Sequence, residues 1–184
     1  MIELPVSLGE AIDKLTILEI KLEKINDNRH KEVQVEHSLL LEKLKTFIKK
    51  YHKLYESMKK VNLIIWDDMN ALRDGEIIDD VLYGVLCRKV ITYNDIRFRL
   101  KNKINMLSES VIKEQKGYKI NKIVVRSKNV KEITYLSFLY DQVIVVGDKI
   151  AGVEDDDIAF VDYWDDSQIS VCNIDENTIS RLIS

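Results

Sequence analysis

The chain has 184 residues, of which 46% are hydrophobic and 32% are charged, and its formal net charge is −3. This composition is typical of a folded chain with long solvated helices, and the acidic balance argues against a nucleic-acid partner. Because the sequence has no apolar run of about 18 residues and no apolar leader at its start, we expect no membrane span, no signal peptide and a cytoplasmic location.

The first predicted helix begins after Ser7, because Ser7 followed by Glu10 is the pattern of a capping box. Its apolar stripe repeats at spacings of three and four residues and consists of Leu8, Ala11, Leu15, Leu18, Leu22 and Ile25. That spacing is typical of a heptad seam that packs against other helices. The polar run Asn26–Asn28 predicts a turn at its end.

The second predicted helix runs from about Arg29 to Arg73 and ends before Gly75. Its seam consists of His37, Leu40, Leu44, Phe47, Tyr51, Leu54, Met58, Val61, Ile65, Asp68 and Leu72. The chain's single proline, Pro5, lies outside this segment, so the sequence indicates no break in it. At about 1.5 Å per residue, such a helix spans about 65 Å.

The third predicted helix begins at Asp79 or Asp80 and runs to about Glu114. Its seam consists of Leu86, Val90, Tyr93, Arg97, Leu100, Ile104, Leu107 and Val111. Arg97 therefore lies on a packing face, and Asn94, Lys101 and Asn105 flank it. Polar groups on such a face need partners.

After Gly117 the pattern changes to short β-branched runs. Strands are predicted at 122–126, 142–146, 157–163 and 169–173, with a helix between the first two strands and a terminal helix at 175–184. Two strands joined by a helix are expected to lie parallel in one sheet. We therefore expect an α+β fold: an N-terminal antiparallel bundle with a long coiled-coil hairpin (residues 1–117) and a small C-terminal α/β unit with a short, partly parallel sheet (residues 118–184).

The turn near Gly75 predicts a hairpin in which Arg97 faces Glu56. The first helix then covers only about residues 30–47 of the second, and the distal hairpin keeps more apolar surface than two helices bury. A second chain is the simplest cover, giving a homodimer, and the rival is the C-terminal unit folding back. The predicted interface residues are Leu63, Ile64, Trp66 and Met69.

The polar stripe of the third helix has two main interpretations. One is internal pairing of Arg97 with Glu56 and with acids of the first helix. The other is a site for an anionic ligand, for which the candidate residues are Asn94, Arg97, Lys101, Asn105, Glu10 and Lys14. A third interpretation is that solvent alone covers the stripe. No residue pattern defines a catalytic group.

Metal and cofactor motifs are missing from the sequence. His30, His37 and His52 are spaced by 7 and 15 residues, unlike the close pairs of zinc sites, and no C-x-x-C motif occurs. The segment SKNVKE after the first predicted strand lacks the glycines of a nucleotide-phosphate loop. We expect neither a metal nor a cofactor.

Four segments resemble a known family: SLGEAIDKLTILEIKLEKI, IIWDDMNALRDG, YNDIRFRLKNKIN and EQKGY. The resemblance covers about residues 2–118 and is to an uncharacterised helical family, a domain of unknown function, of bacteria and large DNA viruses. The positions that its pattern stresses are Glu10, Asp13, Lys14, Glu19, Lys21, Trp66, Asp68, Arg73, Asn94, Asp95, Lys101, Asn105, Glu114 and Tyr118.

Members of that family are encoded among genes for surface-glycan and lipopolysaccharide synthesis, and some are fused to glycosyltransferases. The C-terminal part is also similar to a fragment of the nucleotide-type α/β half of a glycosyltransferase. These likenesses imply a non-catalytic oligomeric binding or assembly protein beside glycan-synthesis enzymes, with a glycosyltransferase as a possible partner. The alternative they leave open is an enzyme or sugar-nucleotide binder that uses the polar stripe.

Overall fold

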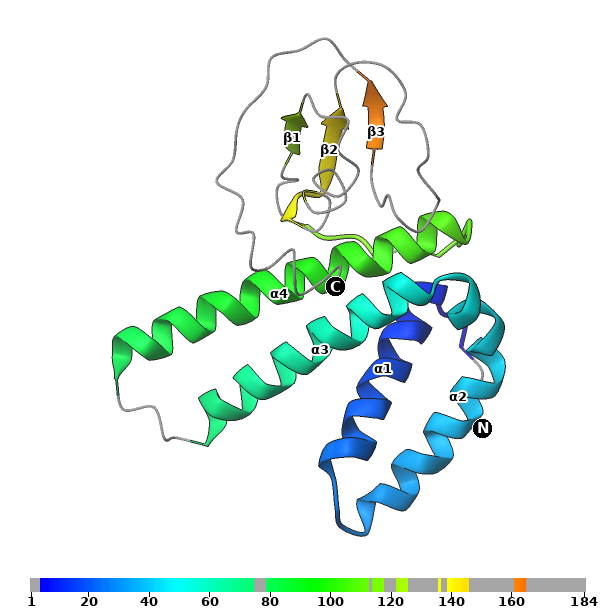
Figure 1. Cartoon of the computed structure of the whole chain (residues 1–184), viewed down its shortest axis with the longest axis vertical. Helices are drawn as coiled ribbons and strands as arrows, with labels where there is room; N and C mark the ends of the chain where they lie inside the picture. Colours follow the sequence, from blue (N-terminus) through cyan, green and yellow to red (C-terminus); the bar gives the residue numbers. More distant parts are fainter. Residues whose placement is uncertain are drawn as a thin grey trace.

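The computed structural model describes residues 4–74, 79–112, 114–117, 122–125, 136, 139–145 and 161–164. Four α-helices form its main part, namely α1 (Leu8–Lys24), α2 (Arg29–Lys50), α3 (His52–Arg73) and α4 (Asp80–Leu107). Three short strands follow, namely β1 (Lys122–Val125), β2 (Gln142–Val145) and β3 (Val161–Trp164) (Figure 1).

The first and last helices, α1 and α4, begin directly after the N-cap residues predicted from the sequence. The Ser7 side chain accepts a hydrogen bond from the backbone N–H of Glu10 at 3.2 Å, which satisfies a donor that the first turn of α1 leaves open. Asp79 accepts from the N–H of Val81 in the same way at the start of α4. Both predicted N-termini are confirmed.

The predicted second helix is two helices, because the chain bends at Tyr51. This residue has φ −113° and ψ 38°, and it separates α2 from α3. Its side chain is buried, and its hydroxyl donates to the backbone carbonyl of Leu107 at the end of α4 over 2.9 Å. Burial of this ring against α4 holds the bend, so the predicted continuous rod of about 65 Å is wrong.

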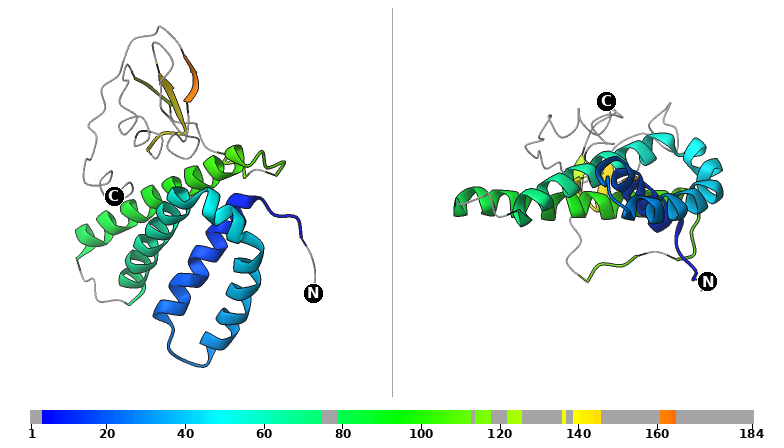
Figure 2. Two further views of the ribbon diagram at one scale, coloured as in Figure 1. Left: turned by 45° about the vertical axis from the view of Figure 1, so that its right-hand side comes forward. Right: turned by 90° about the horizontal axis from the view of Figure 1, so that it is seen from below.

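The bend produces two helical hairpins instead of one long one. The views in Figure 2 show α1 beside α2 and α3 beside α4, with the bend between the pairs. α1 packs against α3 and α4 as well as against α2. It therefore covers more of the bundle than the predicted range 30–47.

The hydrophobic core lies where α1, α3 and α4 meet. Its buried members are Ile12, Leu15, Leu44, Leu54, Tyr55, Met58, Val61, Tyr93, Ile96, Leu100 and Ile104. α2 supplies only Leu44 as a buried residue, so it is an outer helix of the bundle.

The predicted α+β class is wrong, because the described structure is mainly helical. The helices have 17, 22, 22 and 28 residues, whereas each strand has four. Among the residues whose burial is described, which include only Val143 of the strands, the buried hydrophobic residues are Val143, Leu136 and 16 residues in the range 12–104. A fold class follows from where apolar surface is buried, and here that surface lies between helices.

The three strands pair in parallel in the order β1-β2-β3. Just before β2, Asp141 accepts a hydrogen bond from Arg99 of α4 at 2.8 Å, so this segment is attached to the C-terminal half of α4. The predicted strand 169–173 and helix 175–184 lie outside the described residues, as does most of the helix predicted between the first two strands. The division at residue 117 stays a prediction.

Candidate functional site

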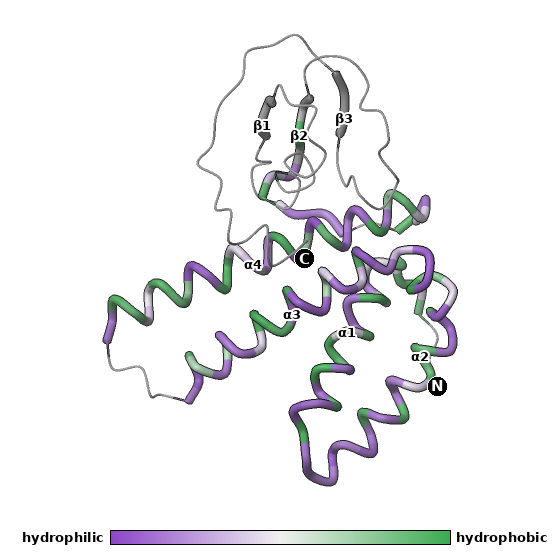
Figure 3. The backbone as a smooth tube through the Cα atoms, in the orientation of Figure 1, coloured by the Kyte–Doolittle hydropathy of each residue, from purple (hydrophilic) through white to green (hydrophobic). Residues whose placement is uncertain are grey.

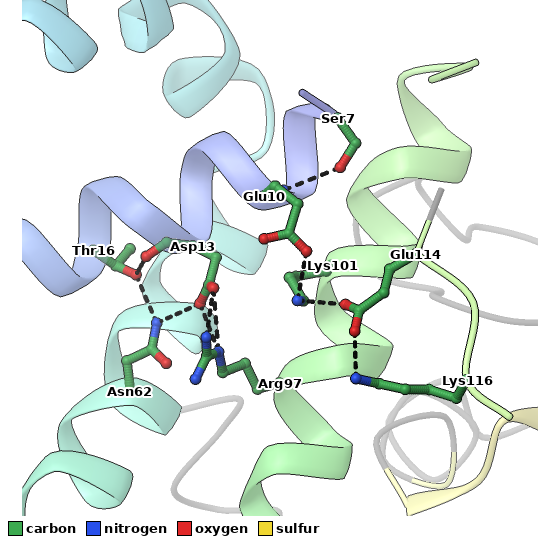
Figure 4. A network of polar contacts seen from close by, with 9 residues as sticks. All are labelled: Ser7, Glu10, Asp13, Thr16, Asn62, Arg97, Lys101, Glu114 and Lys116. Carbon is green, nitrogen blue, oxygen red and sulfur yellow. Dashed lines mark hydrogen bonds and ion pairs between the residues drawn. The ribbon is translucent and has the colours of Figure 1, made fainter. Parts of the chain in front are cut away.

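Asp13 is the centre of a buried polar network between α1, α3 and α4 (Figure 4). Asp13 is 3% exposed. Its two carboxylate oxygens accept hydrogen bonds from Arg97, one from Nε at 3.0 Å and one from Nη2 at 2.9 Å. Asn62 of α3 donates to the same carboxylate at 2.8 Å and to Thr16 Oγ1 at 2.9 Å. One buried acid therefore joins three helices through a two-point pair with arginine.

Lys101 forms a second part of the network, one turn further along α4. Its side chain is 9% exposed, and its ammonium lies 2.6 Å from a carboxylate oxygen of Glu10 and 2.5 Å from one of Glu114. Burial lowers the pKa of Lys101, but the hydrogen bonds and charges of the two glutamates outweigh it and raise that pKa above its ordinary value. Lys101 is therefore a cation held between two acids.

Glu114 comes from the segment after α4 and also pairs with Lys116. Burial raises the pKa of Glu114, but hydrogen bonds from Lys101 and Lys116, with their positive charges, lower it from 4.5 to about 2. Glu114 is therefore ionised at neutral pH and is not suited to donate a proton.

Gly9 brings α1 and α4 into direct contact beside this network. Its backbone N–H donates to the side-chain oxygen of Asn105 at 2.7 Å. A Cβ atom at Gly9 would lie 2.4 Å from the backbone oxygen of Lys101, so only glycine allows this approach. Asn105 is fully buried, and its Nδ2 makes no hydrogen bond in the structure.

Four of the six predicted ligand residues belong to this network: Glu10, Arg97, Lys101 and Asn105. The other two lie apart from it. Asn94 is exposed and donates to the backbone oxygen of Val90 within α4. Lys14 forms an exposed ion pair with Glu36 of α2. The predicted ligand site is thus divided between the network and the surface.

The structure gives Arg97 a different partner from the one that the hairpin register predicts. Asp13 of the first helix holds it, as one part of the internal-pairing interpretation expected, whereas the predicted pair with Glu56 is wrong. The α3–α4 hairpin is shifted from the predicted register, since Asp68 meets Lys89 in it. α1 packs against both of these helices and brings Asp13 to Arg97.

Asn62 and Thr16 are the network residues that the sequence analysis missed. Each is a polar residue at a buried position beside an apolar seam, and that mismatch is the signal that could have identified them.

A second polar cluster joins the other end of α1 to α2 and α3. Glu19 accepts a hydrogen bond from the Tyr55 hydroxyl and pairs with Lys59 at 3.1 Å. His37 of α2 lies 3.8 Å from the same carboxylate. Burial, followed by the hydrogen bond to Glu19, raises the pKa of Tyr55 well above its ordinary value. Tyr55 therefore stays protonated and acts as a donor.

The distal end of the α3–α4 hairpin differs from the predicted interface. Leu63, Ile64, Trp66 and Met69 of α3 are each half-buried, and Ile64 packs against the core. The more exposed apolar side chains lie on α4, where Val81 is 75%, Val85 56% and Ile91 64% exposed. Figure 3 shows hydrophobic and hydrophilic stretches alternating along α4.

Residues 2–138 match a family described as Family of unknown function (DUF6165), and the chain therefore belongs to that family. Comparisons with curated proteins and with solved structures found no match. Within the described residues, no three His, Cys, Asp or Glu side chains are grouped as metal ligands, and no helix has the length and apolar character needed to cross a bilayer.

Proposed function

We propose that the protein is a non-catalytic assembly module that self-associates through the distal part of its α3–α4 hairpin. The observation that supports this is the contrast between a polar network whose charges are matched within the chain and a group of apolar side chains on α4 that stay exposed in the described part of the structure. A ligand site usually presents polar groups that are free to bind, whereas the ionic groups of this network already bind one another.

The exposed apolar side chains supply a reason to associate. Val81, Val85 and Ile91, all in the N-terminal half of α4, are each more than half exposed. Burial of apolar surface stabilises by about 25 cal/mol per Å², so covering these side chains in a dimer contributes several kcal/mol. Single exposed apolar residues are ordinary on a surface, but a group of them at one end of a helix is typical of an interface.

Light scattering of the purified full chain over a series of concentrations tests this proposal. We expect the mass to rise from the chain mass of 21.5 kDa toward twice that value as concentration increases. The variant Val85→Glu, which places a charge on the open face, should shift the transition to higher concentration. The matched control Val35→Glu changes an equally exposed valine on α2 and should leave it unchanged. A monomer throughout the series contradicts the proposal.

The setting proposed for this assembly is the cytoplasm, beside enzymes of surface-glycan synthesis and with a glycosyltransferase as partner. The resemblance of the four segments named above supports it. Purified glycosyltransferase encoded next to this chain should bind the wild-type protein and lose binding to Val85→Glu if the open face is shared. If the glycosyltransferase does not bind the wild-type protein, the proposed role beside glycan-synthesis enzymes is contradicted. The proposal of self-association is not affected by that result.

One observation favours the alternative, a binder of an anionic ligand or sugar nucleotide. The Nδ2 of Asn105 is a buried donor without a hydrogen bond, beside the N-terminus of α1. Calorimetric titration with uridine diphosphate sugars distinguishes the two. Binding that is lost in Lys101→Met but kept in Lys14→Met would favour the alternative, and no heat of binding would leave the assembly proposal in place.

A further inference from the structure

α4 has a second seam, on the side away from the one that packs in the bundle. It consists of Val81, Gly84, Arg88, Ile91 and Asp95, at spacings of three, four, three and four residues. Such a repeat keeps one face of a helix aligned with a partner helix. No helix of the described part covers it, since Val81 and Ile91 are 75% and 64% exposed.

The same face is covered further along the helix. Val81 and Arg99 are five turns apart and so point in the same direction. Arg99 is 6% exposed and binds Asp141, and Phe98 beside it lies under the ammonium of Lys116 at 5.0 Å. The face is therefore a packing surface over its C-terminal half, whereas its N-terminal half has the same orientation and no described residue covers Val81 or Ile91.

Gly84 is the second observation. Glycine inside a helix costs about 0.5–1 kcal/mol relative to alanine, so its presence there needs a reason. At Gly9 the reason is the contact with α4, but a Cβ atom at Gly84 would meet nothing within 4 Å. The space left by Gly84 is unused within the chain, and a second helix backbone can approach closely there.

The charges on this face are complementary to a second copy of it. Asp80 and Arg88 are both exposed, lie on either side of Gly84, and make no ion pair within the described part of the chain. When two such helices run antiparallel, the acidic end of one meets the basic position of the other. A two-fold axis makes each of these contacts occur twice.

We infer that two copies of the chain pair through antiparallel α4 helices whose two-fold axis passes midway between Gly84 and Arg88, with Val81 opposite Ile91 and Gly84 opposite Arg88 of the second copy. The Arg88 side chain passes over the bare Gly84 position and reaches Asp80 of the second copy. This inference rests on the proposed self-association and specifies its face, direction and register.

Disulfide formation between two single-cysteine chains tests the register. Val81→Cys and Ile91→Cys are made separately, each with Cys87→Ser and Cys172→Ser, and mixed under mild oxidation. In one helix these positions are about 15 Å apart, so a fast disulfide reports the second copy. We expect the mixed 81–91 dimer to form on the order of tenfold faster than 81–81 or 91–91 dimers.

Two further variants test the crossing point and the charges. Gly84→Trp should weaken dimerisation by at least about tenfold, since a large side chain separates the helices. Gly117→Trp is the control, because Gly117 also has open space around its Cβ and lies off α4. Asp80→Arg and Arg88→Asp should each weaken the dimer, and the double variant should restore most of the affinity.

The outcomes separate this inference from the proposed function. A wild-type chain that is monomeric at all concentrations overturns both. A wild-type dimer in which 81–81 disulfides form as fast as 81–91 disulfides, or in which Gly84→Trp behaves like Gly117→Trp, overturns the α4 register and leaves self-association in place. Circular dichroism of each variant confirms that the compared chains are folded.

Discussion

The two halves of α4 have the same helical pattern and opposite surroundings. In the C-terminal half, Arg97 and Lys101 meet acids of α1, and Arg99 meets Asp141. In the N-terminal half, Val81, Val85 and Ile91 face outward. The difference comes from where α1 crosses, since its acids and apolar residues reach only one half of the helix.

This contrast explains why polar residues occupy a packing face. A buried carboxylate is tolerated when a cation and further hydrogen bonds compensate it, and Asp13 meets that requirement with hydrogen bonds from Arg97 and Asn62. The pair fixes how three helices meet. In the N-terminal half of α4, Lys89 pairs with Asp68 of α3, but within the described residues Val81, Val85 and Ile91 stay exposed, and we propose that a second copy covers them.

The largest expected effect is the loss of the Arg97 side chain. Arg97→Met leaves the Asp13 carboxylate buried without its cation, which should lower the free energy of unfolding by about 3 kcal/mol. Urea denaturation followed by circular dichroism measures it. The double variant Asp13→Leu with Arg97→Met should recover part of the loss, because the isolated charge is gone. A single variant as stable as the wild type would show that the pair is not structural.

The two helical glycines should respond oppositely to alanine. Gly9→Ala places a methyl group 2.4 Å from the Lys101 backbone oxygen and should lower the free energy of unfolding by about 2 kcal/mol. Gly84→Ala meets nothing within the chain and should raise the helix stability by about 0.5–1 kcal/mol. Thermal unfolding at low concentration measures both. If both substitutions changed the free energy of unfolding equally, the proposed difference between the two halves of α4 would be contradicted.

The ion pairs of Glu114 should make stability depend on pH at acidic values. The pKa of Glu114 is lowered in the folded chain from 4.5 to about 2, so its contribution is complete above 4.5 and is lost as pH falls toward 2. Glu114→Gln should therefore cost about 1 kcal/mol at neutral pH and flatten the fall of stability in that window. Unchanged slopes in urea titrations at several pH values would contradict this assignment.

The smallest effect is expected at the exposed pair of Lys14 and Glu36. Their side chains are 58% and 46% exposed, and pairs of this kind contribute about 0–1 kcal/mol. Lys14→Ala should change the free energy of unfolding by less than about 0.5 kcal/mol. A loss comparable to that of Arg97→Met would mean that α2 depends on this contact more than its burial indicates.

Local features of this chain could be predicted from its sequence. The caps at Ser7 and Asp79 and the heptad seams depend on neighbouring residues, and the structure confirms those starts. An acid of the first helix as partner of Arg97 also followed from the polarity of the seam.

The bend at Tyr51 could not be predicted, because its cause is distant in sequence. The Tyr51 hydroxyl binds the carbonyl of Leu107, and no proline or glycine marks the site. That error hid how α1 packs against both α3 and α4, where Asp13 meets Arg97. The predicted α+β class was also wrong because it relied on local pattern. Short β-branched runs indicate extended backbone, but the buried core of the described residues is helical.

Hydrogen exchange along α4 at low and high protein concentration tests the central claim most directly. The amides of residues 84–92 should become more protected as concentration rises, while those of residues 96–105, already covered within the chain, should not change. Protection that is independent of concentration in both halves would contradict the claim that the open half of α4 binds a second copy.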